Sequence, residues 1–343
     1  MNSARRGVLV MALGLLAALV AGFGAAGCTG SSGDTLTVYS GRTENLIGPL
    51  LDDFAQETGI DIDVRYGQSA DLALLIESEG DRSPADVFIS QSPGALGFLE
   101  ADGRLSELSP ETLDLVDEQF RDPDGEWVGL SARVRVLVYN TDAVNEDELP
   151  ESVFDLVNEE YAGRVGVAPE NGSFQDFVSG MRETVGDDET SAWLEGMADN
   201  GTQTYANNTA ILEAVARGEV DMGLVNHYYN ERAKAENPDT PTENYFFPGG
   251  DLGTLVLVTG AGIVDTAPHP DDAEELLAFL LNEESQQFFA AETFEYPLAA
   301  GVEPTVDLPP LAGIDTPPVT LGALGGDLAV TRDMISDSGL GAG

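Results

Sequence analysis

The chain is poor in cysteine, lysine and histidine. Among its 343 residues, Cys28 is the only cysteine, Lys234 is the only lysine, and there are 2 histidines. A single thiol excludes an intramolecular disulfide and any metal site built from several cysteines. The sequence also lacks a nucleophile elbow, a zinc-ligand helix and a phosphate-binding loop. These absences argue against an enzyme.

Positive charge is scarce as well. The chain has 15 Lys and Arg against 61 Asp and Glu, which gives a formal net charge of -46 at pH 7. Nucleic acid and anionic lipid would repel such a chain as partners. The acidic residues are spread over every segment, so we interpret the charge as a halophilic adaptation rather than as a cation-binding site. Disorder is the other interpretation of high charge, and the regular apolar periodicity argues against it.

The N-terminal segment has the order of an export signal. Arg5 and Arg6 precede an apolar run that ends in small residues. This run is too short and too rich in glycine for a membrane span, so residues 1–27 are predicted to be a signal peptide. The position of Cys28 resembles a bacterial lipobox. It predicts a lipidated N-terminus, a linker over residues 28–34, and an extracytoplasmic protein anchored to the cell membrane. The arginine pair also resembles a twin-arginine signal, so both export routes stay open.

Beyond this segment, the predicted strands and helices alternate in an α/β order. Short apolar or alternating runs predict strands, and apolar residues at helical spacing predict helices. The first part reads as βαβαβ, which implies parallel strands and ligand-binding loops at their carboxyl ends. Strands are expected at Leu36–Tyr39, Ile60–Tyr66, Asp86–Ile89, Val134–Tyr139, Val165–Ala168, Thr204-Tyr205, Met222–Val225 and Leu255–Thr259.

The length of the mature chain predicts two lobes. About 315 residues exceed what a single core usually organises. The strand Val134–Tyr139 is expected to carry the chain into a second lobe, and Leu255–Thr259 to bring it back. We therefore predict a first lobe over 35–132, a second lobe over 133–256, and a return to the first lobe with C-terminal helices and a tail over 257–343.

The most informative residues stand where one predicted strand ends. Tyr228 and Tyr229 follow the apolar run Met222–Val225. Iron(III) is a hard Lewis acid, and its charge can remove a phenol proton far below the usual pKa of about 10. Adjacent residues of a strand point to opposite faces, so two tyrosines that share one ion must lie where the backbone turns. In the other interpretation, one tyrosine packs in the core and the other lies on the surface.

Eight short segments together carry a family resemblance. They are Val38–Arg42, Tyr66–Leu72, Ala85–Ile89, Leu130–Arg135, Pro169–Phe174, Tyr205–Thr209, Gly218–Val220 and Asn226–Asn230. Each is weak alone, but their order and spacing are specific. With them the chain resembles the periplasmic-type ferric-iron-binding proteins, the solute receptors of iron ABC transporters, over nearly all of its mature sequence. The resemblance implies an α/β fold with the two-lobe architecture of type II (Venus-flytrap) periplasmic binding proteins, with mixed sheets and a hinge.

The resemblance implies roles only at matching positions. Tyr228 and Tyr229 match the family's paired iron ligands. Gly172 and Ser173 match a loop that holds the synergistic anion, carbonate or phosphate, which completes the coordination of the iron. A helix N-terminus also favours an anion on physical grounds, because it offers free backbone donors and a favourable dipole. An ordinary helix cap is the other interpretation of Gly172 and Ser173.

Four more polar residues belong to the implied anion site. Asn208 and Asn226 match asparagines that contact the anion in the family, although Asn208 also fits the N-cap region of a helix. Arg133 matches an arginine near the cleft, and a surface charge is its other interpretation. Arg42 is a candidate to hold a bound carbonate.

The chain departs from the family at three ligand positions. Some relatives supply a histidine and a glutamate from the first lobe, where this chain has Thr43 and Gln91. Others supply a third tyrosine where this chain has Asn171. Two phenolates leave ferric charge and coordination sites unmet, which leaves room for anions, water or a chelated iron species. His227 and Glu44 are weaker candidates for the missing ligands.

The sequence therefore predicts a binding protein that is not an enzyme. We expect a monomeric lipoprotein that captures ferric iron with a synergistic anion and delivers it to an ABC permease and its ATPase. A receptor of the same fold for thiamine, a polyamine or a phosphonate is the main alternative. An extracytoplasmic enzyme and a sensory or adhesion module are further alternatives, because one fold can serve many functions.

Overall fold

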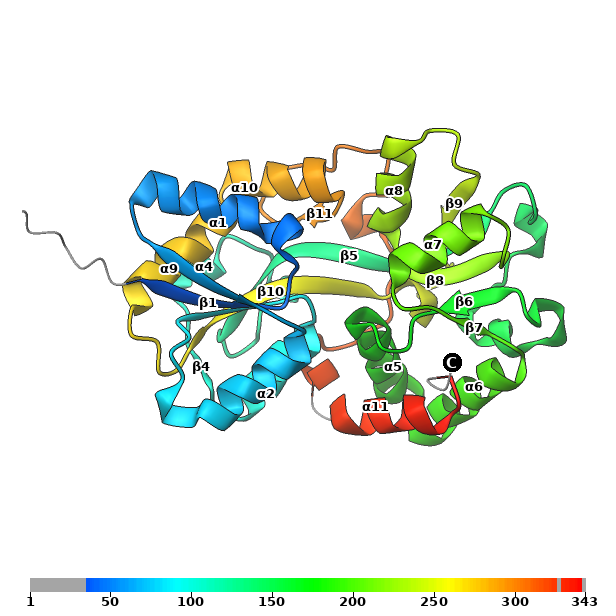
Figure 1. The fold of residues 1–343 in the computed structure, drawn as a ribbon, viewed down its shortest axis with the longest axis horizontal. Coiled ribbons are helices and arrows are strands. Elements are labelled where there is room, and N and C mark those ends of the chain that lie inside the picture. The colour runs from blue at the N-terminus through cyan, green and yellow to red at the C-terminus, as the bar shows by residue number, and fades with distance from the viewer. Residues whose placement is uncertain (1–34, 326–327, 341–343) are drawn as a thin grey trace, which may run out of the picture. The chain divides into compact units, whose positions relative to one another are not determined.

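The computed structural model describes residues 35–325 and 328–340 (Figure 1). The predicted signal peptide, the linker and the lipidation site at Cys28 lie outside these residues. Residues 34–343 form one compact unit that is not divided into two lobes. The lobe boundaries at 132/133 and 256/257 therefore stay predictions. No helix in the described part of the chain is long and apolar enough to span a membrane.

The elements follow the predicted alternation. The strands are β1 (Leu36–Ser40), β2 (Ile62–Tyr66), β3 (Val87–Ser90), β4 (Leu105–Ser106), β5 (Trp127–Asn140), β6 (Val165–Val167), β7 (Gln203–Thr204), β8 (Met222–Asn226), β9 (Thr242–Tyr245), β10 (Val256–Val264) and β11 (Tyr296–Pro297). The helices are α1 (Glu44–Thr58), α2 (Ser69–Glu79), α3 (Pro93–Ala101), α4 (Pro110–Leu113), α5 (Gly172–Val185), α6 (Asp187–Asp199), α7 (Asn208–Ala216), α8 (His227–Glu236), α9 (Pro270–Leu280), α10 (Glu283–Phe288) and α11 (Leu328–Asp337). Each predicted strand is confirmed, and β5 begins earlier than expected. The strands β4, β9 and β11 were not predicted, because two-residue strands and the polar run of β9 carry no apolar pattern.

The strands form a continuous mixed sheet in the order β2-β1-β3-β10-β5-β8-β6-β7. β1, β2 and β3 are parallel, as predicted. The long strand β5 joins two parts of the sheet, because Trp127–Val134 pairs with β10 and Arg135–Asn140 pairs with β8 and β9. We call β1–β4, β10 and β11 the first half of the sheet, and β6–β9 the second half. β5 and β10 run side by side through the middle of Figure 1.

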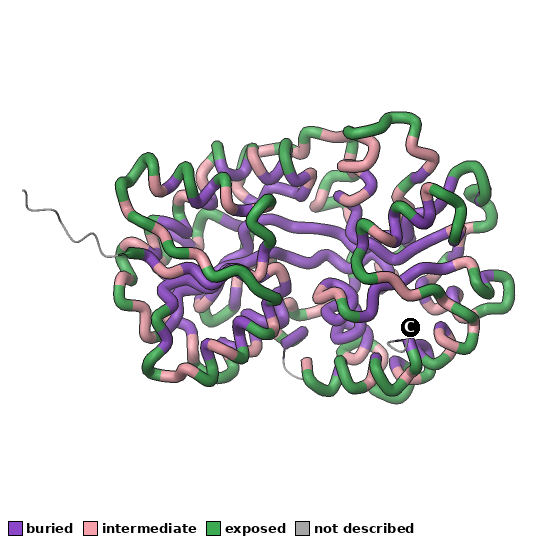
Figure 2. The backbone as a smooth tube through the Cα atoms, in the orientation of Figure 1, coloured by how far each residue is buried: buried purple, intermediate pink, exposed green. Residues whose placement is uncertain are grey.

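Burial of the central strands explains their sequences. Every residue of β5, β8 and β10 is buried, and the purple trace in Figure 2 runs through both halves. Strands covered on both faces read as near-continuous apolar runs. Arg133 and Arg135 interrupt this run in β5 while being buried themselves. Buried charges need partners, so these two arginines indicate where function is to be sought.

Three helices of the second half begin at the same edge of the sheet. β6, β7 and β8 are parallel, so their carboxyl ends lie side by side. The chain leaves β6 for α5, β7 for α7 and β8 for α8. The N-terminal ends of three helices therefore meet at one place, which is where ligands bind in open α/β sheets.

The C-terminal part of the chain connects the two halves a third time. After β11 the chain reaches a short 3-10 helix, η9 (Gly322–Gly325), which contacts both α3 and α5. The last helix, α11, packs against α5 and α6 in the second half. Besides β5 and β10, a segment near residue 322 thus links the halves.

Candidate metal centre

The predicted tyrosine pair lies in the first turn of a helix. β8 ends at Asn226 and α8 begins at His227, which places Tyr228 and Tyr229 directly after the turn. Their rings are stacked, with centroids 4.4 Å apart and planes inclined by 28°. Tyr228 is buried and Tyr229 is half-buried. The two phenols therefore lie together, which successive residues of an extended strand would not do.

His227 has no nitrogen left for a metal. Its Nδ1 accepts a hydrogen bond from the Val134 backbone N–H at 3.1 Å. Nε2 therefore carries the proton of the neutral ring and donates to the Phe294 carbonyl at 3.0 Å. Burial lowers the pKa of His227 to about 4. The residue holds the start of α8 against β5, and neither of its ring nitrogens is free to bind a metal.

The buried phenol keeps its proton until a strong Lewis acid displaces it. Burial, and then the neighbouring Tyr229, raise the pKa of Tyr228 well above its ordinary value. The described residues contain no group of three or more His, Cys, Asp or Glu side chains that could hold a metal ion. A metal bound here would therefore rest on the two phenols and on ligands from outside. Its charge must overcome the high phenol pKa, which a trivalent ion does best.

Arg133 is a buried residue, so its interpretation as a surface charge is wrong. Its Nε lies 3.4 Å from the Ser173 hydroxyl, and its Nη1 lies 3.4 Å from the Thr259 hydroxyl. Its Nη2 donates a short hydrogen bond to the Gln91 carbonyl and lies 3.8 Å from the Asp176 carboxylate. Arg133 thus connects β5 with α5, β10 and the loop after β3.

Arg135 presents a free donor edge. Its Nη1 donates to Asn226 Oδ1 at 3.0 Å, whereas its buried Nε and Nη2 have no hydrogen-bond partner. Nε and Nη2 lie on one side of the planar guanidinium and form a fork that matches two oxygens of a carboxylate or phosphate. Burial, and then the nearby Arg133, lower the pKa of Arg135 to about 9, while Tyr229 and Tyr228 raise it in part. Two unpaired donors on one buried cation have the chemistry that suits an oxyanion.

Arg135 is a candidate site residue that the sequence does not single out. The alternation of β5 placed it on the same face as Arg133, and that spacing was the signal that could have found it. The two arginines differ in their contacts in the folded protein. Arg133 is largely occupied by its neighbours, and the edge of Arg135 is not.

The predicted anion contacts gather around this edge. The Asn226 amide donates to the Ser173 hydroxyl at 3.2 Å. The cap of α5 is Asn171, whose Oδ1 accepts from the Ser173 N–H at 3.1 Å and from the Asn208 amide at 3.3 Å. The Oδ1 of Asn208 is buried without a partner. Asn207, and not Asn208, caps α7. The free Oδ1 of Asn208 is an acceptor, so an anion could bind only the amide N–H group of Asn208, which already donates to Asn171.

Arg42 is engaged by a carboxylate of the protein. Both of its Nη atoms bind Glu295, at 3.1 and 2.7 Å, and Nη1 also donates to Thr259 at 2.7 Å. Arg42 and Glu295 are both buried. The guanidinium is therefore neutralised within the fold, and this geometry favours a structural role over the predicted contact with carbonate.

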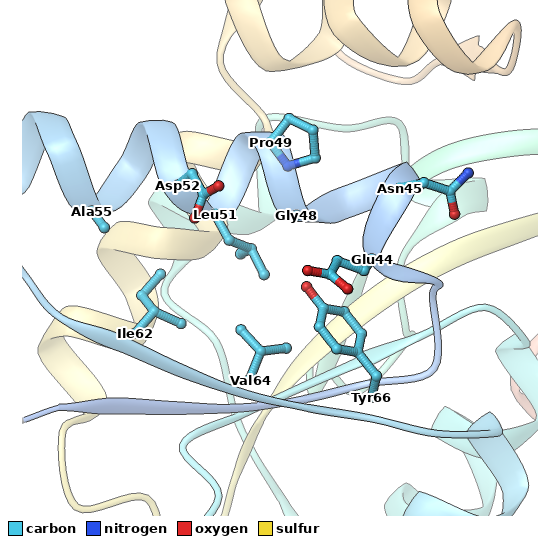
Figure 3. A pocket seen from close by; sticks show the side chains of 10 residues that line it. All are labelled: Glu44, Asn45, Gly48, Pro49, Leu51, Asp52, Ala55, Ile62, Val64 and Tyr66. Carbon is cyan, nitrogen blue, oxygen red and sulfur yellow. The ribbon is translucent and has the colours of Figure 1, made fainter.

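The first half offers few strong ligands at the positions the family uses. Thr43 is the exposed N-cap residue of α1, and its hydroxyl bonds Asn45 at 2.6 Å. Glu44 lines a hollow of about 310 Å³ between α1 and β2, beside the phenol of Tyr66 (Figure 3). No residue of the second half lines this hollow. Glu44 therefore lies in a hollow of the first half, and neither Tyr228 nor Tyr229 lines that hollow.

Comparison with known proteins shows the family to which the chain belongs. Residues 82–313 match the family described as bacterial extracellular solute-binding protein. The chain belongs to the bacterial extracellular solute-binding proteins. This solute-binding protein is 30% identical to the Fe(3+)-binding periplasmic protein of Serratia marcescens over 329 residues, which are 95% of this chain and 96% of the relative.

Solved structures agree with this assignment. Iron-bound HitA from Pseudomonas aeruginosa matches with a TM-score of 0.84 and 36% identity, over 89% of this chain and 99% of that chain. A Trichodesmium protein in complex with iron and citrate ligands matches with a TM-score of 0.77 and 29% identity, over 90% and 100%. The predicted fold class and the predicted resemblance are confirmed. The family description and the name of the Serratia relative are those of binding proteins, which agrees with the expectation that this solute-binding protein is not an enzyme.

Proposed function

We propose that this solute-binding protein captures ferric iron together with an oxyanion. The observation that carries the proposal is the stacked pair Tyr228 and Tyr229 beside the free donor edge of Arg135. The names of relatives from Serratia marcescens and Pseudomonas aeruginosa add support, because both refer to bound iron.

The charges of the site favour an anion with two negative charges. Two phenolates leave one positive charge on iron(III), and the guanidinium of Arg135 adds another. A dianion, such as carbonate or hydrogen phosphate, would balance both. It would take the fork of Arg135 with two oxygens and leave a third for the iron. Ser173, Asn208, Asn226 and the N-terminus of α5 with Gly172 would hold its remaining oxygens.

Coordination sites that the protein leaves open would be filled by the cargo. Thr43, Gln91 and Asn171 stand where relatives supply stronger ligands, so water or a chelator must supply oxygens. The Trichodesmium relative, solved with iron and citrate ligands, supports a chelated cargo as a second form. Citrate would place carboxylates at the same fork of Arg135.

Delivery requires the site to close and open. β5 and β10 connect the two halves of the sheet and are the expected hinge, because bending there moves the first half over the tyrosines. We propose that the closed form docks on an ABC permease driven by its ATPase. Lipidation at Cys28 would keep the monomeric receptor at the membrane, with the iron site outside the cytoplasm.

A spectrum of the iron-loaded protein tests the proposal. Phenolate ligands should give a visible phenolate-to-iron charge-transfer band, and metal analysis of protein purified without chelator should find iron. Tyr228→Phe and Tyr229→Phe should each weaken the band and the affinity without unfolding the protein. Tyr139→Phe is the matched control, because Tyr139 lies at the opposite end of the β5–β8 pairing, beside Met222.

Two outcomes would overturn the proposal. One is a protein that stays colourless after ferric loading. The other is an iron affinity that neither phenylalanine variant changes. Either result would transfer the assignment to a small organic ligand, for which thiamine, a polyamine and a phosphonate are the probes.

A further inference from the structure

One buried carboxylate reaches from the second half of the sheet to the first. Asp176 lies on α5, about one helical turn after Ser173, and is fully buried. Its Oδ1 accepts a short hydrogen bond from the hydroxyl of Ser92, which lies between β3 and α3. The two residues are 84 positions apart in the chain. This hydrogen bond therefore joins a helix of the second half to the first half without passing through β5 or β10.

The side chain of Ser92 is directed at α5. Ser92 is the N-cap residue of α3, all of which the structure describes, yet its side chain makes no capping hydrogen bond with that helix. A serine at this position usually accepts a hydrogen bond from a free N–H group of the first turn. Here the hydroxyl donates to Asp176 instead, and Ser92 is itself buried. Its orientation therefore depends on the contact with α5.

Gly94 allows the two helices to approach each other. A Cβ added to Gly94, in the first turn of α3, would lie 3.2 Å from Asp176 Oδ1 and 2.8 Å from the Leu324 carbonyl oxygen. A side chain at this position would therefore push α5 away from α3. Without one, the carboxylate of Asp176 lies against the N-terminal turn of α3, where the helix dipole favours a negative charge.

The guanidinium of Arg133 supports the same connection. Its Nη2 lies 3.8 Å from Asp176 Oδ2 and donates to the carbonyl of Gln91, the residue before Ser92. Its Nε lies 3.4 Å from the hydroxyl of Ser173, which belongs to the candidate anion site. A buried polar network thus extends from the candidate anion site to the loop after β3.

The stability of the fold gains little from this carboxylate. Oδ2 of Asp176 has no hydrogen-bond partner among the described residues, and its 3.8 Å separation from Arg133 is too long for a hydrogen bond. A buried charge with few hydrogen bonds costs desolvation free energy that its ion pair recovers only in part. The contribution of Asp176 is therefore expected in the position of α5 relative to the first half.

We propose that Asp176 is a positioning residue whose hydrogen bond with Ser92 holds the two halves in the closed form. The inference rests on the proposed capture of iron, because it assigns this contact to the retention of that cargo. Opening the halves must break the bond from Ser92 to Asp176 and the bond from Arg133 to Gln91. Interactions that exist only in the closed form raise the population of that form.

The rate of iron release to an excess of chelator at pH 7.5 tests the proposal. Burial, offset in part by Arg133, raises the pKa of Asp176 to about 6, so the carboxylate is ionised at this pH. Asp176→Asn keeps the size of the side chain and removes its charge, whereas Ser92→Ala removes the donor. Each variant should release iron about 10–100 times faster than the wild type, as expected for the loss of one charge-assisted hydrogen bond. The double variant should be no faster than the single variants, because both substitutions break the same contact.

Ser179→Ala is the matched control. Ser179 is buried on the same helix, but its hydroxyl bonds Thr331 of α11, within the second half, at 2.9 Å. This variant should release iron at the wild-type rate. The charge-transfer band of the iron-saturated protein should keep its position in every variant, because the phenols are untouched. Wild-type release rates in Asp176→Asn and Ser92→Ala, or a double variant whose effect is the product of the single effects, would overturn the proposal.

Small-angle scattering of the iron-free protein separates this contact from the identity of the cargo. Asp176→Asn and Ser92→Ala should each have a larger radius of gyration than the wild type and Ser179→Ala, because their halves open more often. Thermal unfolding of each variant verifies that the expanded protein is folded. This expansion is expected even if the ligand is not iron. Equal radii in all four proteins would overturn the role of Asp176 and leave the proposed capture of iron standing.

Discussion

Replacing Arg135 by methionine should weaken ligand binding without weakening the fold. Methionine keeps the unbranched shape of the side chain and removes the guanidinium. In the empty protein the substitution breaks one hydrogen bond, from Nη1 to Asn226. In the loaded protein it would remove the fork formed by Nε and Nη2, which have no other partner.

The loss of binding free energy can be estimated from the two hydrogen bonds that Nε and Nη2 would donate to the anion. Charge-assisted hydrogen bonds contribute about 1.5–3 kcal/mol each. Two of them account for about 3–6 kcal/mol, or about 10²–10⁴ in affinity. Arg135→Lys keeps the charge but not the fork, so its loss should be intermediate. The effect should appear only when carbonate, phosphate or citrate is supplied with the iron.

The effect on stability should have the opposite sign. Burial lowers the pKa of Arg135 far below its ordinary value, to about 9, a depression that corresponds to a cost on the order of 5 kcal/mol for the charged form at neutral pH. A depressed folded pKa means that the unfolded chain binds more protons between about pH 9 and the ordinary arginine pKa, so stability is lower below that window. Arg135→Met removes this cost, and its melting temperature should equal or exceed that of the wild type.

Arg42→Met is the matched control, because Arg42 is equally buried but paired. Removing it leaves Glu295 without its partner, and breaking a buried pair costs about 3–5 kcal/mol. Iron affinity would be measured by competition with a chelator, and stability by thermal unfolding, for both variants. Unchanged affinity in Arg135→Met, or a fold destabilised as strongly as in Arg42→Met, would refute the assignment of the free edge.

Four other predictions concern the phenols, the third ligand, the charge and the anchor. Because burial raises the pKa of Tyr228, binding should release protons, and log K for iron should rise by about 2 per pH unit below neutrality; a slope near zero in a pH series would exclude displacement of two phenol protons. Asn171→Tyr should tighten iron binding and intensify the charge-transfer band, while the lost cap on α5 costs about 1 kcal/mol in thermal unfolding; weaker binding would contradict a third phenolate. With a net charge of -46, the melting temperature should rise between 0.1 M and 1 M salt, as the Debye length falls from about 10 Å to about 3 Å; a flat profile would refute self-repulsion. Intact-mass analysis of membrane-extracted protein should show a chain that begins at a lipidated Cys28, and an unmodified Cys28 in a longer chain would contradict the lipobox.

The order of the elements and the place of the tyrosines can be predicted from the amino-acid sequence. Apolar periodicity located the strands because side chains alternate along a strand. It also showed where β8 ends, and therefore where Tyr228 and Tyr229 leave the sheet. The alignment of Asn171, Asn208 and Asn226 at one edge follows from three parallel strands, each followed by a helix. The strand ends are local signals, whereas the pairing that brings β6, β7 and β8 side by side is a tertiary contact.

Which polar groups are free depends on contacts that form when the chain folds. Arg42 and Arg135 look alike in the sequence, yet Arg42 meets Glu295, 253 positions away along the chain, and Arg135 keeps two donors unpaired. His227 stands beside the tyrosines in sequence, and the backbone at Val134 and Phe294 occupies both of its nitrogens. Whether a buried group can bind a ligand depends on partners brought together by folding, and a residue's own neighbours in the chain do not reveal them.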